Sequence, residues 1–220
     1  MCGRYSLGRT DRMDWASFGV APLDQLVPRW NIAPGTDVLA IRHAGDDHET
    51  AWLRWGLIPS WAKDPAIGHK LANARAETAH EKPSFRAAVK ARRCLLPADG
   101  FYEWQVVAGT RKKQPWRIER TDGAILALGA LWEFWRDAAG EKIETCTVLT
   151  VPVNEALAHI HDRLPLILEP RDWNRWLSPH TTVDKARELL HAVPDDTLSA
   201  WRISDRVNTV SHDDPSLVTP

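Results

Sequence analysis

The chain has 220 residues, with 28 lysines and arginines against 29 aspartates and glutamates and a formal net charge of −1 at pH 7. This balance gives no sign of a general affinity for nucleic acid or for a membrane surface, so such a partner would need a local patch. No run approaches the roughly 20 apolar residues of a membrane span, and no apolar segment of signal length opens the chain. Three widely spaced cysteines without a CxxC pair predict neither a disulfide framework nor a metal site. We therefore expect a cytoplasmic protein with no membrane partner.

The predicted strands follow one another through the middle of the chain, without a βαβ alternation and without a linker or an internal repeat. We therefore expect one α+β domain over residues 1–220, with a largely antiparallel, barrel-like β-sheet flanked by short helices. The strands share β-branched or aromatic residues between turn signals. They are expected at residues 38–41, 50–57, 94–96, 101–107, 116–119, 125–131, 145–151 and 165–168, with one more from residue 201.

Short helices are expected between and after these strands. The first covers residues 11–18, and a second begins after Ser84, whose hydroxyl can cap it. A third covers residues 154–161. Pro170 opens a fourth, because proline is tolerated in the first helical turn, and Thr182 caps a fifth that runs to residue 190.

The N-terminal residues, from Met1 to Arg4, carry a functional group that no internal residue has. Met1 is expected to be removed because a small side chain follows it, which leaves Cys2 at the N-terminus. An α-amine with a pKa of about 8 then lies beside a thiol with a pKa of about 8.5. This 1,2-aminothiol can condense with an aldehyde, first as an imine and then as a thiazolidine. An N-terminal nucleophile that attacks an amide is a second interpretation, and an ordinary buried cysteine is a third.

Four further polar residues lie in contexts where a solvated surface is not expected. Glu103 lies between two aromatic residues on an apolar strand, where burial would raise the pKa of its carboxyl toward a value suited to acid–base catalysis. A glutamate at the wet edge of the strand is the alternative. Asn73 and Arg75 are two residues apart and would face the same way in an extended segment, although Arg75 could simply pair with Glu77. His161 could carry protons, or it could be an ordinary surface or capping residue.

Seven segments resemble the ordered motif set of the SRAP family, the SOS response-associated peptidase-like proteins. They read MCGRY at residues 1–5, NIAP at 31–34, WGLIPSWA at 55–62, NARAET at 73–78, RCLLPADGFYEW at 93–104, LWE at 131–133 and IHDRLP at 160–165. The resemblance spans nearly the whole chain, and the first motif must be N-terminal. Ala62 departs from the second tryptophan that some relatives have at this place.

The resemblance implies a sensor of abasic sites in single-stranded DNA, whose ring-opened sugar presents an aldehyde. The Cys2 amine would form an imine with this aldehyde, and the thiolate would close a thiazolidine crosslink that shields the lesion. Asn73 would orient the amine or the sugar, and Glu103 would move protons. His161 would assist opening of the sugar ring.

The resemblance also implies which residues contact DNA. Arg4, Arg75 and Arg163 would hold the phosphates that flank the lesion. Pro34 and Trp61 would pack against bases at a junction between single strand and duplex. We expect no cofactor and no metal, and a bacterial-type monomer that associates with the nucleoid when it is bound to DNA.

Two other functions stay open at this point. Cys2 could be the N-terminal nucleophile of a cysteine peptidase or amidohydrolase, with autoproteolysis as a limited form of the same chemistry. The chain could also be a non-covalent single-stranded DNA binding module in which Cys2 is incidental.

Overall fold

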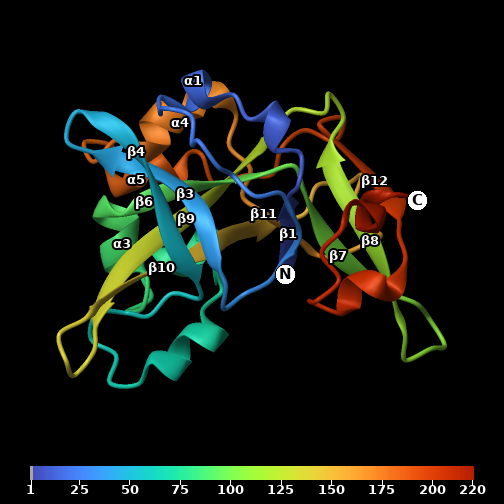
Figure 1. The fold of residues 1–220 in the computed structure, drawn as a ribbon, viewed down its shortest axis with the longest axis horizontal. Helices are drawn as coiled ribbons and strands as arrows, with labels where there is room; N and C mark the ends of the chain where they lie inside the picture. Colours follow the sequence, from blue (N-terminus) through green and yellow to red (C-terminus); the bar gives the residue numbers. More distant parts are fainter. Residues whose placement is uncertain (1) are drawn as a thin grey trace.

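The computed structural model describes residues 2–220, and the expected removal of Met1 concerns a residue outside this range. The larger of its two sheets has seven strands (Figure 1). These strands are β3 (Asp37–Ala44), β4 (Asp47–Trp55), β5 (Asn73–Arg75), β6 (Arg93–Ala98), β9 (Leu126–Arg136), β10 (Lys142–Pro152) and β11 (Arg163–Pro165).

Strand β10 closes this sheet into a barrel. It pairs antiparallel with β9 over residues 142–148 and parallel with β4 at residues 145–146. Antiparallel pairs of β4 with β3, β3 with β6, and β6 with β9 complete a ring of five strands. Only the pairs of β10 with β4 and with β5 are parallel in the part of the chain that the structure describes. The expected α+β fold with a largely antiparallel, barrel-like sheet is therefore confirmed, while the domain limits at residues 1 and 220 stay a prediction.

The smaller sheet is open and has the N-terminal strand in its interior. Its strands run in the order β12 (Leu198–Arg202), β8 (Lys113–Arg120), β7 (Gly100–Val106), β1 (Arg4–Leu7) and β2 (Arg29–Ile32). Figure 1 shows β1 between the barrel and the β7–β8 hairpin. Because β1 has a partner strand on each side, the residues just before it are held at a fixed place.

A fully buried ion pair fastens β1 to this sheet. The Arg117 guanidinium lies 2.7 Å from the Asp99 carboxylate and donates to the Ser6 hydroxyl at 2.5 Å. Asp99 also accepts the amides of Gly8 and Arg9, each at 2.6 Å. Burial works against ionisation of Asp99, but the Arg117 charge and these hydrogen bonds outweigh it and lower its pKa. Each charge therefore has a partner of opposite sign, as a buried charge requires.

The helices are short and lie on the outside of the sheets. Helices α1 and α4 pack together (Figure 1). Between them, Phe18 stacks on Trp173 at a ring-centroid distance of 4.0 Å. Among the described residues, no helix is both long enough and apolar enough to cross a membrane. The α-helices are α1 (Trp15–Phe18), α2 (Ala76–Ala79), α3 (Arg86–Ala91), α4 (Pro170–Leu177) and α5 (Val183–Arg187), and the 3-10 helices are Thr10–Arg12, Pro65–Lys70, Asp205–Asn208 and Pro215–Val218.

Three of the five expected helices differ from the structure. The expected helix over residues 11–18 is split, because the Asp14 carboxylate accepts the Ser17 amide and starts a new helix after it. Phe85 rather than Ser84 precedes α3, without a side-chain cap. Residues 154–161 form turns, since the Asn154 side chain bonds the carbonyls of residues 193 and 194 instead of capping a helix. Helix α4 begins at Pro170 and α5 follows the Thr182 cap, as expected, although α5 ends at residue 187.

Candidate active site

Cys2 lies at the point where the open sheet meets the barrel. Its side chain is completely buried, and its thiol makes a weak contact with the Arg4 carbonyl, at 4.0 Å. The Asn73 amide donates to the Cys2 carbonyl at 2.8 Å. Asn73 begins β5, which is fixed by its parallel pairing with β10. The side chain of Asn73 therefore holds the backbone of residue 2 from the barrel side.

The extended conformation expected for Asn73 and Arg75 is confirmed. Ala74 between them is buried, whereas Asn73 is half-buried and Arg75 is exposed, so the two polar side chains share the outer face of β5. The Asn73 side-chain oxygen is buried and accepts no hydrogen bond from any described residue. This oxygen is available to a donor that arrives with a ligand.

Glu103 lies on β7, next to the residue pair that joins β7 to β1. Tyr102 pairs with Arg4, so one further step along the two strands brings Glu103 toward Gly3. Its side chain is only 2% exposed. Burial raises the pKa of the Glu103 carboxyl to about 7, and the nearby negative charge of Asp162 acts in the same direction. The wet-edge alternative is therefore wrong, and Glu103 is able to give and take protons near neutral pH.

His161 faces Glu103 from the turn that precedes β11. The Arg163 amide donates to Nδ1 of His161 at 3.0 Å, so the ring proton of the neutral imidazole sits on Nε2. That Nε2 lies 3.9 Å from Oε2 of Glu103. Burial lowers the pKa of His161, and the positive charge of Lys113 adds to the effect, whereas the exposed carboxylate of Asp162 opposes it. His161 is therefore neutral at pH 7 and directs its N–H toward the carboxyl group.

The thiol of Cys2 is protonated in this setting. Burial raises its pKa well above the ordinary value, and the negative charge of Glu103 raises it further. A thiolate is the reactive nucleophile, so this thiol needs a base before or during its attack. Glu103, with a pKa of about 7, is the nearby group whose proton affinity suits that task.

Arg4 is engaged inside the protein. Its guanidinium donates to the Asn31 side chain at 2.6 Å and to the Val207 carbonyl at 2.8 Å, and it lies 5.9 Å from the centre of the Trp104 ring. Asn31 is buried, and its own amide donates to carbonyls of residues 207–212. Sequence reasoning missed this role of Asn31, although its position in the NIAP motif was a signal.

Arg75 and Arg163 differ in their surroundings. The guanidinium of Arg163 donates to both carboxylate oxygens of Glu77, at 2.5 and 2.9 Å, and also to the Thr150 carbonyl. The guanidinium of Arg75 is exposed and forms neither a hydrogen bond nor an ion pair with any described residue. The direct ion pair of Arg75 with Glu77 is therefore not formed: Glu77 pairs with Arg163, and the more distant charge of Arg75 adds to the lowering of the Glu77 pKa. Sequence reasoning missed this pairing, since Glu77 and Arg163 are 86 residues apart.

Pro34 and Trp61 are both on the surface. Pro34 is exposed, and the Trp61 side chain is 58% exposed, with one long hydrogen bond from its indole to the Pro83 carbonyl at 3.4 Å. An exposed indole of this kind offers a flat apolar surface for stacking. Within residues 2–220, no three His, Cys, Asp or Glu side chains gather in a way that could hold a metal ion.

Comparison with known proteins agrees with the motif order. The family model described as SOS response associated peptidase (SRAP) matches residues 1–210. The abasic site processing protein YoqW of Bacillus subtilis (strain 168) is 38% identical over 222 residues, which cover 99% of this chain and 99% of that protein. The abasic site processing protein YedK of Escherichia coli (strain K12) is 30% identical over 231 residues, which cover all of both chains.

Solved structures share the fold. A crystal structure of a Bacteroides thetaiotaomicron protein matches with a TM-score of 0.82 at 26% identity, covering 99% of this chain and 98% of that one. A Bordetella bronchiseptica protein matches with a TM-score of 0.79 at 30% identity, covering 92% of this chain and all of that one. The family model, the full-length relatives and the resemblance read from seven motifs agree, and the chain belongs to the SRAP family.

Proposed function

We propose that the chain captures abasic sites in single-stranded DNA covalently, through Cys2 after removal of Met1. The observation that carries the proposal is that Asn73 holds the Cys2 backbone beside a buried glutamate whose pKa is raised to about 7. Relatives named abasic site processing proteins support the choice of substrate. An abasic sugar in its ring-opened form carries the aldehyde that an aminothiol needs.

The proposed reaction uses two additions at the aldehyde carbon. The Cys2 amine adds to the carbonyl and water leaves, which gives an imine. The thiol then adds across the C=N bond, its proton ends on the nitrogen, and a five-membered thiazolidine closes. The net change is the loss of one water molecule, with no oxidant or reductant.

Glu103, Asn73 and His161 have separate roles in this scheme. Glu103 takes the proton from an incoming nucleophile and returns it to the departing oxygen, which its pKa of about 7 allows at neutral pH. Asn73 orients residue 2 through the carbonyl contact at 2.8 Å. His161, neutral and protonated at Nε2, donates to the ring oxygen of the sugar as the ring opens.

The DNA is proposed to run past this site with its phosphates on arginines. Arg75 has an exposed guanidinium without a hydrogen bond or direct ion pair to any of residues 2–220 and is the residue most ready to take a phosphate. Arg4 and Arg163 would contribute from the positions where the protein already holds them. Pro34 and Trp61 would stack on bases at a strand-to-duplex junction. We expect a monomer to suffice for binding the DNA and forming the crosslink.

The test uses an oligonucleotide with one abasic site. The processed protein should give an adduct that survives denaturant and heat. Cys2→Ala keeps the terminal amine, so it should give an adduct only when borohydride reduces the imine. A chain with extra N-terminal residues has no amine at Cys2 and should give neither adduct. A heat-stable adduct with Cys2→Ala would reject the thiazolidine.

The raised pKa of the Cys2 thiol applies equally to a cysteine peptidase, so it does not separate the two functions. The peptidase has less support because the full-length relatives are named abasic site processing proteins. Turnover of a peptide library that Cys2→Ala abolishes would favour the peptidase.

A further inference from the structure

The Arg163 guanidinium clamps three elements together at the edge of the candidate active site. Both of its terminal nitrogens reach the Glu77 carboxylate, and one of them also contacts the carbonyl and, at 3.3 Å, the hydroxyl of Thr150. Arg163 begins β11, Thr150 lies on β10 and Glu77 lies on α2. A two-pronged contact of this kind fixes direction as well as distance.

This clamp is charged and largely buried on the arginine side. The Arg163 side chain is 12% exposed and that of Glu77 is 42% exposed. The hydrogen bonds from Arg163 lower the pKa of Glu77, so its carboxylate stays ionised in neutral solution. Thr150 pairs with Arg75 of β5 on one side of β10 and with Pro165 of β11 on the other. The clamp therefore lies across strands whose register is already set.

The contact between Arg163 and His161 is made by the backbone of Arg163, not by its side chain. The amide of Arg163 donates to Nδ1 of His161. This contact is a single hydrogen bond within a turn, so it persists only while residues 161–163 keep their conformation. Through its ion pair with Glu77, the side chain of Arg163 connects the turn at residues 161–163 to helix α2.

We propose that Glu77 is a positioning residue that acts through Arg163 to hold His161 in one tautomer and one orientation. The proposal rests on the function assigned above, in which His161 donates from Nε2. It gives Arg163 a structural task in addition to any contact with phosphate. Glu77 itself touches neither the sugar nor Cys2 in this scheme.

Other charges around His161 do not replace this contact. Glu103 approaches Nε2 from β7, Lys113 acts on the ring from β8, and Asp162 lies beside Nδ1 at 3.0 Å from the same turn. The Asp162 side chain is 86% exposed, so water screens it. The amide of Arg163 is the donor that keeps Nδ1 without a proton.

The decisive variant is Glu77→Gln, which keeps the size of the side chain and removes its charge. Glu81→Gln is the matched control, because Glu81 lies four residues further on and contacts His80 rather than Arg163. Glu77→Asp keeps the charge on a shorter side chain and should rescue part of the effect. Nitrogen NMR of the His161 ring reports the tautomer, and amide hydrogen exchange reports the Arg163 N–H.

In Glu77→Gln we expect the His161 ring to sample both tautomers and the Arg163 amide to exchange about tenfold faster. Adduct formation should slow about tenfold, by analogy with metal-binding histidines, whose orienting partners have effects of about 10- to 100-fold. Glu81→Gln should match the wild type in all of these measurements.

Two results would separate this proposal from the assigned function. An unchanged His161 tautomer and unchanged Arg163 exchange in Glu77→Gln would overturn the positioning role, even if the wild type forms the adduct. A changed tautomer in a protein whose wild type forms no adduct would support the positioning role and reject the assigned function.

Discussion

Two buried polar networks lie on either side of β1, and they are built in opposite ways. The Arg117 and Asp99 pair with Ser6 balances its charges, and the pKa of its carboxyl is lowered. The network around Cys2 contains a carboxyl whose pKa burial raises to about 7 and an imidazole whose pKa burial lowers. The charges of the first network compensate each other, whereas the second holds two titratable groups whose pKa values are shifted by burial, at a cost in stability.

Breaking the balanced network should have the largest effect on stability. Arg117→Ala leaves the Asp99 carboxylate buried without its counter-charge, so the free energy of unfolding should fall by about 3–5 kcal/mol. Urea unfolding followed by tryptophan fluorescence measures it. Arg206→Ala is the control, because its pair with Asp214 is about half exposed on both sides and should contribute less than about 1 kcal/mol. Equal effects would remove the distinction between the two kinds of pair.

Replacing Glu103, the central group of the second network, should raise the free energy of unfolding instead of lowering it. Glu103→Gln avoids the cost of a buried negative charge at pH 8, so the variant should be more stable than the wild type by about 2 kcal/mol. Adduct formation should fall about 10²- to 10⁴-fold. A variant that is both active and less stable would show that Glu103 is a structural residue.

The pH dependence of stability sharpens the same point. The unfolded chain releases the Glu103 proton near pH 4.5, and the folded chain holds it to about pH 7. Between these values the folded state binds more protons, so this group makes the free energy of unfolding fall as pH rises, by at most about 3 kcal/mol. The difference in the free energy of unfolding between the wild type and Glu103→Gln, measured by urea unfolding from pH 4 to 8, isolates this contribution. A flat difference would contradict the raised pKa.

The smallest effect on stability is expected at Arg75, which belongs to neither network. Arg75→Ala should change the free energy of unfolding by less than about 0.5 kcal/mol. It should still weaken non-covalent binding to single-stranded DNA and reduce the slope of log affinity against log salt by about 0.7. Arg171→Ala, a change at another exposed arginine, is the control. An unchanged slope would show that Arg75 does not contact the DNA phosphates.

The sequence predicted the strands better than the helices for a physical reason. Strand segments such as residues 145–151 carry their own signal in β-branched side chains, and β10 includes that segment. The helix expected at residues 154–161 failed because Asn154 bonds carbonyls 39 and 40 residues away, a contact that no local pattern encodes. Short helices are decided by such tertiary contacts more than by propensity.

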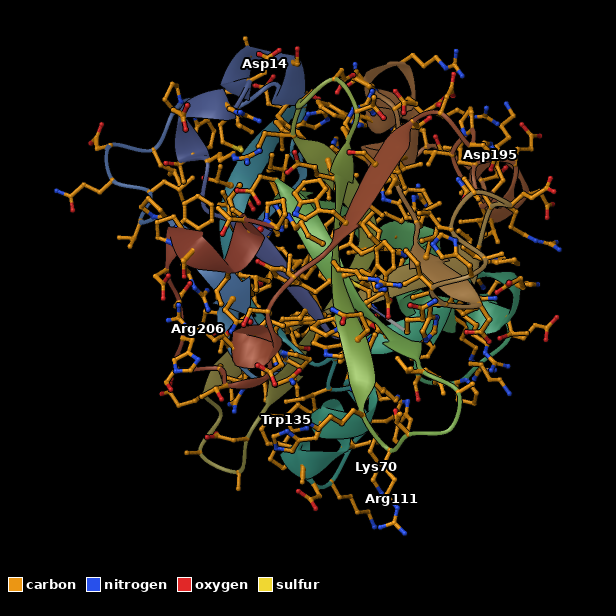
Figure 2. The ribbon with its side chains drawn as sticks, turned by 90° about the vertical axis from the view of Figure 1, so that its right-hand side faces the viewer. Asp14, Lys70, Arg111, Trp135, Asp195 and Arg206 are labelled. Carbon is orange, nitrogen blue, oxygen red and sulfur yellow. The ribbon has the colours of Figure 1, made fainter. Side chains whose placement is uncertain are left out.

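The candidate site shows the same division. The aromatic neighbours of Glu103 indicated a desolvated carboxyl, and its burial bears this out. Local context singled out Asn73 and His161, and the resemblance gave them roles; in the structure Asn73 contacts Cys2 and His161 faces Glu103. The pairing of Arg163 with Glu77 could not be derived, because a local partner for Glu77 was nearer in the sequence. Figure 2 shows another feature that patterns do not supply, the projection of Arg111 beyond the body of the molecule at the tip of the β7–β8 hairpin.

The interior position of β1 also sets an order of events during synthesis. Residue 2 leaves the ribosome first, but β7, which pairs with β1, ends only at residue 106. At about 5–20 residues per second, β1 waits about 5–20 s for that partner. In this interval the N-terminus is open to processing enzymes, and after folding Cys2 is completely buried. We therefore expect the trimming of Met1 to take place on the nascent chain.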